Sequence, residues 1–245
     1  MFVGVDGCKN GWIKVELTDD DNWKVDIFPD IASLWNECKR ASLILIDIPI
    51  GLRDSGCDER HCDKKAREML GPMRASSVFP APCRGALDAN SYEQACQINK
   101  RMTGRKLSLQ TWSILPKIRE VNNLLINDAL SRSHIRETHP EVCFWALAGG
   151  RPMLHSKKKK EGRSKRLELL KTIYPQTEEV IKYASKNWLR RDLALDDVLD
   201  ALVASITARK GFDKLLSIPE VPEIDSYGLP MEIVYFYDTS KSSAS

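Results

Sequence analysis

Two short apolar runs that each end in or next to an aspartate constrain the fold of this chain more than any other feature. Residues 2–6 read FVGVD, and residues 43–48 read LILIDI. An almost wholly apolar run of this length predicts a strand covered on both faces, as in a parallel sheet between two layers of helices. The sequence therefore predicts an α/β fold with Asp6 and Asp47 at the ends of two central strands.

The segments around these runs complete the predicted sheet. Residues 12–17 and 23–28 have strand patterns separated by turn residues, so they predict an antiparallel meander with the first run. A predicted helix over residues 30–40 leads into the second run, and residues 135–138 predict a further strand. We expect a mixed sheet of three antiparallel strands plus parallel strands, flanked by helices.

Helical patterns dominate the rest of the chain. We interpret residues 52–133 as a helical insertion within a single domain over residues 1–238, followed by a flexible tail at 239–245. Pro116 is expected to kink or divide the last helix of the insertion. The predicted helices cover residues 58–70, 91–102, 109–130, 140–147, 164–173, 177–187 and 197–210, and residues 228–237 predict a late edge strand.

The composition excludes several classes of protein. Apolar residues make up 42% and charged residues 29%, which is typical of a globular chain rather than a disordered one. No window approaches the roughly 18 consecutive apolar residues of a membrane span. The first residues do not resemble a signal peptide, and seven cysteines do not suggest a secreted disulfide framework. We therefore expect a soluble cytoplasmic protein with no membrane partner.

The net charge of +3 conceals an uneven distribution. Residues 151–191 hold 13 lysines and arginines against 4 acids, a local charge of +9, so the rest of the chain carries −6. Such a segment suggests a polyanionic partner such as nucleic acid, although a solvated charged helix explains most such runs. The candidate phosphate contacts in this segment are Lys157, Lys158, Lys159, Lys160 and Arg163.

Carboxylates collect where the predicted strands and the last helix meet. Burying Asp6 and Asp47 unpaired is costly, so they need a cation or hydrogen-bond donors. Capping explains Asp197 but not Asp200, which lies one turn further on the same helix face. Oxygen ligands of this kind suit Mg²⁺ or Mn²⁺, and two such ions would serve phosphodiester hydrolysis. The candidate ligands and catalytic acids are Asp6, Asp47, Glu141, Asp197 and Asp200.

Four further side chains are candidates for contacts with the substrate. His139 stands beside the proposed metals, where it could position water or protonate a leaving group, or simply cap a helix. Arg60, Arg67 and Arg84 could each bind a phosphate through two hydrogen bonds, or belong to an ion-paired surface. The sequence leaves these alternatives open.

The chain also resembles a known family, through six motifs in order. They are GVDGCKNGW (4–12), DIPIGL (47–52), CDKKAREMLG (62–71), SVFPAPCR (77–84), ETHPEVCFWALAGG (137–150) and DDVLDAL (196–202). In these the chain resembles family four-two-nine of the domains of unknown function, which is described as predicted nucleases of the RNase H-like fold. The resemblance extends nearly end to end and includes GLPMEIVY at 228–235.

A wider resemblance to bacterial Holliday-junction resolvases implies roles for individual acids. Asp6 matches the acid on their first strand, and Asp197 with Asp200 matches the pair that opens their last helix. Asp47 stands where resolvases and RNase H commonly have a glutamate, so Glu141 is a candidate to complete the site. Because the small resolvases lack the helical insertion, their substrate preference does not carry over.

These observations predict a nuclease that uses Mg²⁺ or Mn²⁺ to hydrolyse DNA or RNA. One alternative is an ATP-dependent phosphotransferase of the related actin-like fold, because residues 4–7 (GVDG) could cradle a phosphate. Another is a non-catalytic protein that binds nucleic acid through the basic segment. Resolvases dimerise, and the sequence leaves both a monomer and a homodimer open.

Overall fold

A five-stranded mixed sheet forms the centre of the computed structural model, which describes residues 1–237; the tail predicted at 239–245 lies outside the described residues. The strand order is β3-β2-β1-β4-β5. β1 (Phe2–Cys8) pairs antiparallel with β2 (Gly11–Leu17), which pairs antiparallel with β3 (Trp23–Phe28). β1 also pairs parallel with β4 (Leu43–Ile46), and β4 pairs parallel with β5 (Ile135–Glu137). The predicted mixed α/β sheet is confirmed.

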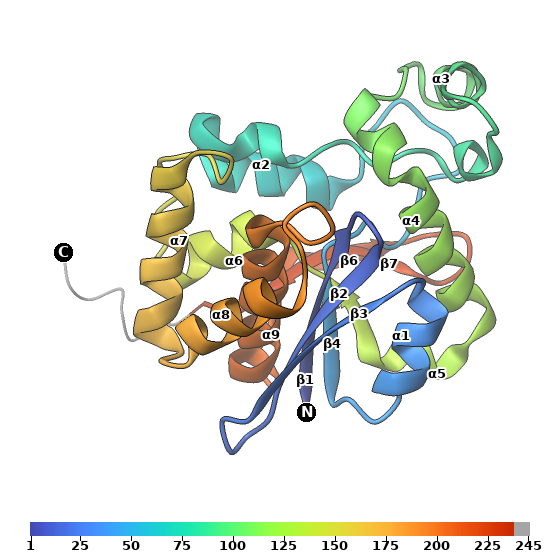
Figure 1. Cartoon of the computed structure of the whole chain (residues 1–245). Coiled ribbons are helices and arrows are strands. Elements are labelled where there is room, and N and C mark those ends of the chain that lie inside the picture. Colours follow the sequence, from blue (N-terminus) through green and yellow to red (C-terminus); the bar gives the residue numbers. More distant parts are fainter. Residues whose placement is uncertain (238–245) are drawn as a thin grey trace.

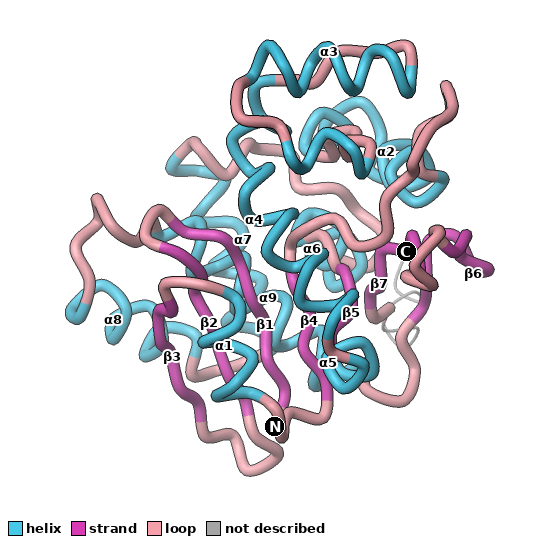
Figure 2. The backbone as a smooth tube through the Cα atoms, turned by 90° about the vertical axis from the view of Figure 1, so that its right-hand side faces the viewer, coloured by secondary structure: helices cyan, strands magenta, loops and turns pink. Residues whose placement is uncertain are grey.

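Helices cover both faces of this sheet (Figures 1 and 2). One face carries α1 (Ile31–Cys38), α4 (Leu109–Asn127) and α5 (Ala129–His134); the other carries α6 (Pro140–Leu147), α7 (Lys160–Ile173), α8 (Thr177–Asn187) and α9 (Leu195–Gly211). Side chains of β1 alternate between these layers. Val3 and Val5 join the core beside α1 and α4, whereas Phe2 packs in the cluster that contains Ala204 of α9. Burial of both faces explains why the central strands are so apolar.

The backbones of α9 and β1 approach closely because residue 4 is glycine. A Cβ atom there would lie 2.0 Å from the carbonyl oxygen of Ala201 and 2.3 Å from the nitrogen of Ser205. Asp6 lies two residues further along β1 and therefore on the same face as Gly4. The close contact thus brings the N-terminal half of α9 to Asp6.

The helical insertion lies beyond the carboxyl ends of β1 and β4 (Figure 1). It contains α2 (His61–Arg74), the 3-10 turns η1 (Ala75–Ser77) and η2 (Arg84–Asp88), and α3 (Tyr92–Thr103) before it leads into α4. The helices predicted in this region exist, although Gly71, at φ 63°, interrupts α2. Pro116 was expected to kink or divide the last of these helices; it does not divide it, since α4 continues to Asn127 with Leu115 and Ile118 in the core on either side of the proline.

The last part of the described chain forms a second, two-stranded sheet. β7 (Pro230–Tyr235) corresponds to the predicted edge strand, but it pairs with β6 (Leu216–Ile224), which the sequence analysis missed. A single parallel bridge between Thr138 and Val234 joins β7 to the chain just after β5. Among residues 1–237, no helix combines the length and the apolar composition needed to cross a membrane.

Candidate metal centre

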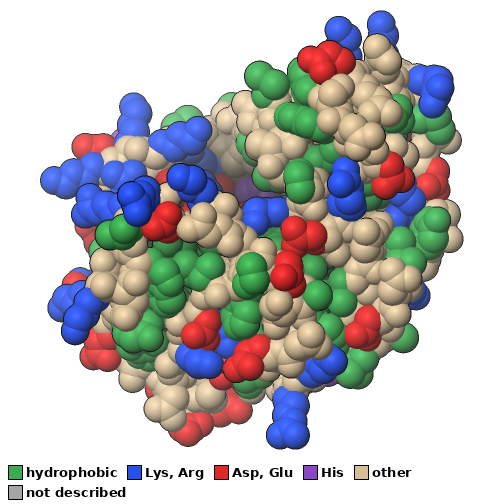
Figure 3. All heavy atoms as spheres, turned by 45° about the vertical axis from the view of Figure 1, so that its right-hand side comes forward, with side chains coloured by type: hydrophobic (Ala, Val, Ile, Leu, Met, Phe, Trp, Pro, Cys, Tyr) green, Lys and Arg blue, Asp and Glu red, His purple; other side chains and the backbone are tan. Residues whose placement is uncertain are grey.

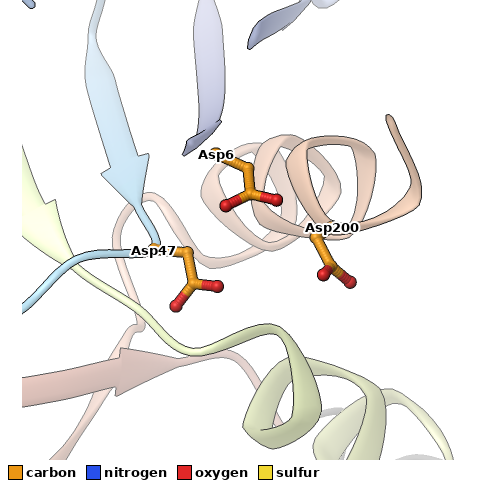
Figure 4. A group of neighbouring side chains, drawn as sticks. All are labelled: Asp6, Asp47 and Asp200. Atoms are coloured by element: carbon orange, nitrogen blue, oxygen red, sulfur yellow. The ribbon is translucent and has the colours of Figure 1, made fainter. Parts of the chain in front are cut away.

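Three aspartates meet at the carboxyl edge of the sheet (Figure 4). Asp6 lies near the end of β1, Asp47 directly follows β4, and Asp200 comes from α9. One carboxylate oxygen from each lies within 4.8 Å of the others. Their convergence follows from topology, because parallel neighbours β1 and β4 end at the same edge and Gly4 admits α9 beside them.

Few hydrogen-bond donors offset the negative charge of these aspartates. Within residues 1–237, the backbone N–H of Gly7 donates to Asp6 at 2.7 Å, and no group donates to the carboxylate of Asp47. Burial, and then repulsion from Asp47 and Asp200, raises the pKa of Asp6 well above its ordinary value. Burial also raises the pKa of Asp47, although His139 and Lys157 oppose that rise. The arrangement is therefore poor in positive charge and suited to a cation.

Lys157 supplies one positive charge from the chain itself. Its ammonium donates a hydrogen bond to Asp200, whose side chain is only 1% exposed. Burial opposes the charge of Lys157, but Asp200, Asp6 and Asp47 together raise the pKa of its ammonium above the ordinary value. Lys157, which was predicted to contact phosphate, is therefore paired with Asp200 of the acidic cluster.

The other predicted acids lie near the three aspartates but have different surroundings. Asp197 accepts a hydrogen bond from the backbone N–H of Ala194 at 3.1 Å, so it caps α9 and does not join the cluster. Glu141 accepts a hydrogen bond from Arg166 at 2.5 Å through Oε1, while its buried Oε2 has no partner among the described residues. Glu141 is thus the neighbouring acid with an oxygen left free.

His139 has the position that the helix-capping alternative predicts. Its Nδ1 accepts a hydrogen bond from the backbone N–H of Glu141 at 3.2 Å, and its Nε2 lies 3.3 Å from the carbonyl oxygen of Ser77. The imidazole lines the same cleft as Asp6 and Asp47. Its contacts position the first turn of α6, which carries Glu141.

The three arginines proposed as phosphate contacts are engaged by protein groups instead. Arg60 is buried, and its guanidinium bonds both carboxylate oxygens of Glu137 and both of Asp63. Arg67 pairs with Glu59, and Arg84 pairs with Asp225. For Arg60 the prediction of an accessible phosphate contact was wrong, because a guanidinium saturated in the interior has no donor left for a ligand.

Basic residues after α6 remain on the surface. Lys158, Lys159 and Lys160 are exposed and form no ion pair with residues 1–237. Arg163 is half-buried and donates to the backbone oxygens of Lys157 and Lys158. Of the predicted phosphate contacts, these three exposed lysines are therefore accessible to a ligand.

Asp6 and Asp47 line a cleft of about 550 Å³ between the sheet edge and the insertion, and Asp200 adjoins them. Figure 3 shows lysine and arginine side chains gathered along one rim of a hollow on this face. The residues lining the cleft include Asp6, Asp47, His139, Glu141, Lys157 and Lys158, with Arg74, Phe79 and Lys117 from the insertion side. The sequence analysis did not single out Arg74 or Lys117, since isolated basic residues on helices carry no distinctive pattern.

A family model matches the chain over residues 4–224, and its description is "Protein of unknown function (DUF429)". The chain belongs to this family. The match confirms the family resemblance carried by the six motifs, while the description names no activity. Comparison with curated proteins and comparison with solved structures found no match.

Proposed function

We propose that this member of the DUF429 family is a nuclease that hydrolyses phosphodiester bonds with Mg²⁺ or Mn²⁺. The observation that carries the proposal is the meeting of Asp6, Asp47 and Asp200, of which Asp6 and Asp47 line the cleft. Carboxylate oxygens are the ligands that these ions prefer, and the cluster has too few donors to stabilise three charges without one. The chemistry of the donor set therefore fits a divalent ion.

The topology supports an RNase H-like assignment of the fold. The sheet order β3-β2-β1-β4-β5, with β1–β3 antiparallel and β4 and β5 parallel to β1, agrees with the family resemblance. Acids on β1, after β4 and on the last helix also agree with the wider resemblance to resolvases. The assignment of the mixed α/β fold as RNase H-like is part of this proposal.

The residues at the cleft would have separate roles in this reaction. When bound, the metal would lower the pKa of a water and stabilise the charge that develops on the phosphate. Asp6, Asp47 and Asp200 would hold the ion, and Glu141, which lines the same cleft, has one further carboxylate oxygen without a partner among residues 1–237. His139 would keep Glu141 in place through its backbone N–H. The exposed lysines at 158–160 would contact the backbone of DNA or RNA.

The packing around the first strand speaks against the phosphotransferase alternative. The space beside Gly4 is filled by the backbone of α9, and the space beside Gly7 by the side chain of Lys117. Gly4, which could have cradled a phosphate, therefore serves helix packing. A non-catalytic binding protein gains nothing from three clustered carboxylates, because they repel a polyanion unless a metal neutralises them.

Cleavage assays test the proposal directly. Purified protein is incubated with a labelled four-way junction, a flap, an RNA–DNA hybrid, and single-stranded DNA and RNA, each with Mg²⁺, Mn²⁺ or EDTA. We expect metal-dependent cleavage that Asp6→Asn and Asp200→Asn abolish, while the exposed Glu168→Gln on α7 cleaves like wild type. Absence of cleavage on all five substrates, or equal cleavage by all variants, contradicts the proposal.

A further inference from the structure

Lys157 differs from the lysines that follow it, because its ammonium lies inside the acidic cluster. It is hydrogen-bonded to Asp200, whereas Lys158, Lys159 and Lys160 point to solvent. The side chain of Lys157 is 38% exposed, against 1% for that of Asp200. A carboxylate as buried as this needs a compensating charge, and the chain provides it.

The loop that carries Lys157 is fixed by contacts along its length. Buried Arg166 donates from Nη1 to the carbonyl oxygens of His155 at 3.0 Å and Gly162 at 2.9 Å. Arg163 donates to the carbonyl oxygen of Lys158 at 3.0 Å. Gly162 allows the loop to fold back on α7, since a Cβ there would lie 2.0 Å from the carbonyl oxygen of Ser156.

The same contacts connect the loop to the candidate metal centre. Nη2 of Arg166 binds Oε1 of Glu141, so one guanidinium holds both the loop and the acid whose other oxygen is unpartnered. A lysine on a mobile surface loop would lose backbone as well as side-chain entropy on pairing. Here the contacts to loop carbonyls already fix the backbone around Lys157, so the cost of ordering the backbone is lower.

We infer that Lys157 takes the place of a second cation, so that the centre binds one divalent ion per chain rather than two. This inference rests on the proposed function and corrects the number of ions that the sequence predicts. Three carboxylates are balanced by one divalent ion and one ammonium. A second divalent ion, with Lys157 still in place, would leave an enclosed site with excess positive charge, which is unfavourable at short range.

Counting bound Mn²⁺ tests this inference without any substrate. Free Mn²⁺ is measured by electron paramagnetic resonance as Mn²⁺ is titrated into wild type, Lys157→Met, Lys157→Arg and Lys158→Met. We expect one ion per chain in wild type, in Lys157→Arg, which retains the charge, and in Lys158→Met, which loses a neighbouring exposed charge. Lys157→Met should take up a second ion or bind the first at least about tenfold more tightly, because it lacks the competing charge.

The outcomes separate this inference from the proposed function. Two tight ions in wild type, or a Lys157→Met variant with unchanged number and affinity, would overturn the role of Lys157 but leave a metal centre. Mn²⁺ bound by neither wild type nor any variant would overturn both proposals. Binding that persists in Asp6→Asn would place the metal elsewhere and count against both. Circular dichroism of each variant identifies any that fails to fold. If Lys157→Met does not fold, the number of ions bound by wild type still decides, because two tight ions contradict the inference.

Discussion

Two groups of acids lie at or beside the same cleft, and they differ in how their charge is balanced. Glu137 and Asp63 share Arg60, which also donates to the carbonyl oxygens of Ile50 and Gly51. The aspartates of the candidate metal centre have a single lysine, Lys157, which is hydrogen-bonded to one of them, Asp200. A carboxylate saturated with hydrogen bonds holds a structure together, whereas a carboxylate short of them retains affinity for a ligand.

The largest loss of stability is expected when the positive charge that balances Glu137 and Asp63 is removed. Arg60→Met leaves the buried carboxylates of Glu137 and Asp63 without a compensating positive charge, and it should lower the free energy of unfolding by about 3–5 kcal/mol. Urea denaturation measures the loss. As a matched control, Arg53→Met breaks a half-exposed pair with Glu223 and should cost less than about 1 kcal/mol. Equal costs for the two variants would mean that the buried network is not structural.

The metal centre should respond in the opposite way. In EDTA, Asp47→Asn removes repulsion among the aspartates, so its free energy of unfolding should equal or exceed that of wild type. With Mn²⁺ at about 100 times its dissociation constant, wild type should gain about 2.7 kcal/mol and Asp47→Asn almost nothing. Urea denaturation with and without Mn²⁺ measures both the stability in EDTA and the gain on metal binding. A variant that loses stability in EDTA would show that Asp47 is structural as well.

A third substitution tests whether close packing creates the metal centre. Gly4→Ala places a Cβ against the backbone of α9, so it should lower the free energy of unfolding by about 1–3 kcal/mol. By moving Asp200 away from Asp6, it should also weaken Mn²⁺ binding. Gly85→Ala is the control, because its Cβ would meet Ile98 at an ordinary 3.6 Å. If the Mn²⁺ affinity of Gly4→Ala equals that of wild type, the close packing of α9 on Gly4 is not required for metal binding.

The smallest effect concerns the acid that caps α9. Burial, with a further contribution from Asp200, raises the pKa of Asp197 to about 6, against an ordinary value of 3.8. The folded state therefore holds this proton more tightly than the unfolded state, and the resulting stabilisation is lost as the pH rises through about 6. In EDTA, Asp197→Asn should match wild type near pH 4 and be more stable at pH 8. Exposed Asp213→Asn should keep the wild-type pH dependence, and a pH-independent difference in Asp197→Asn would contradict the assignment.

The sequence predicted the parts of the site that depend on topology. Asp6 and Asp47 could be placed together because two apolar runs define adjacent parallel strands, and Asp200 because helix capping did not explain it. The family match confirms the family, while the nuclease activity stays a proposal.

Interactions that depend on the path of loops could not be predicted. β6 was missed because Pro219 and Pro222 weaken its strand pattern, and its register shifts between Ile218 and Glu223. No periodicity indicates that Arg60 turns inward to Glu137, or that the first lysine of a basic run reaches Asp200. Such pairings join distant segments, so they become visible only when the chain is folded.

The contact between Gly4 and α9 also determines when the three aspartates of the candidate metal centre can come together during synthesis. Asp6 and Asp47 are translated early, but they remain two carboxylates without a third until translation has passed α9 and that helix has docked on β1. A ribosome-bound chain that stops before residue 195 lacks Asp200 and the helix that carries it. Any cleavage activity of this centre would therefore begin only after α9 has left the ribosome.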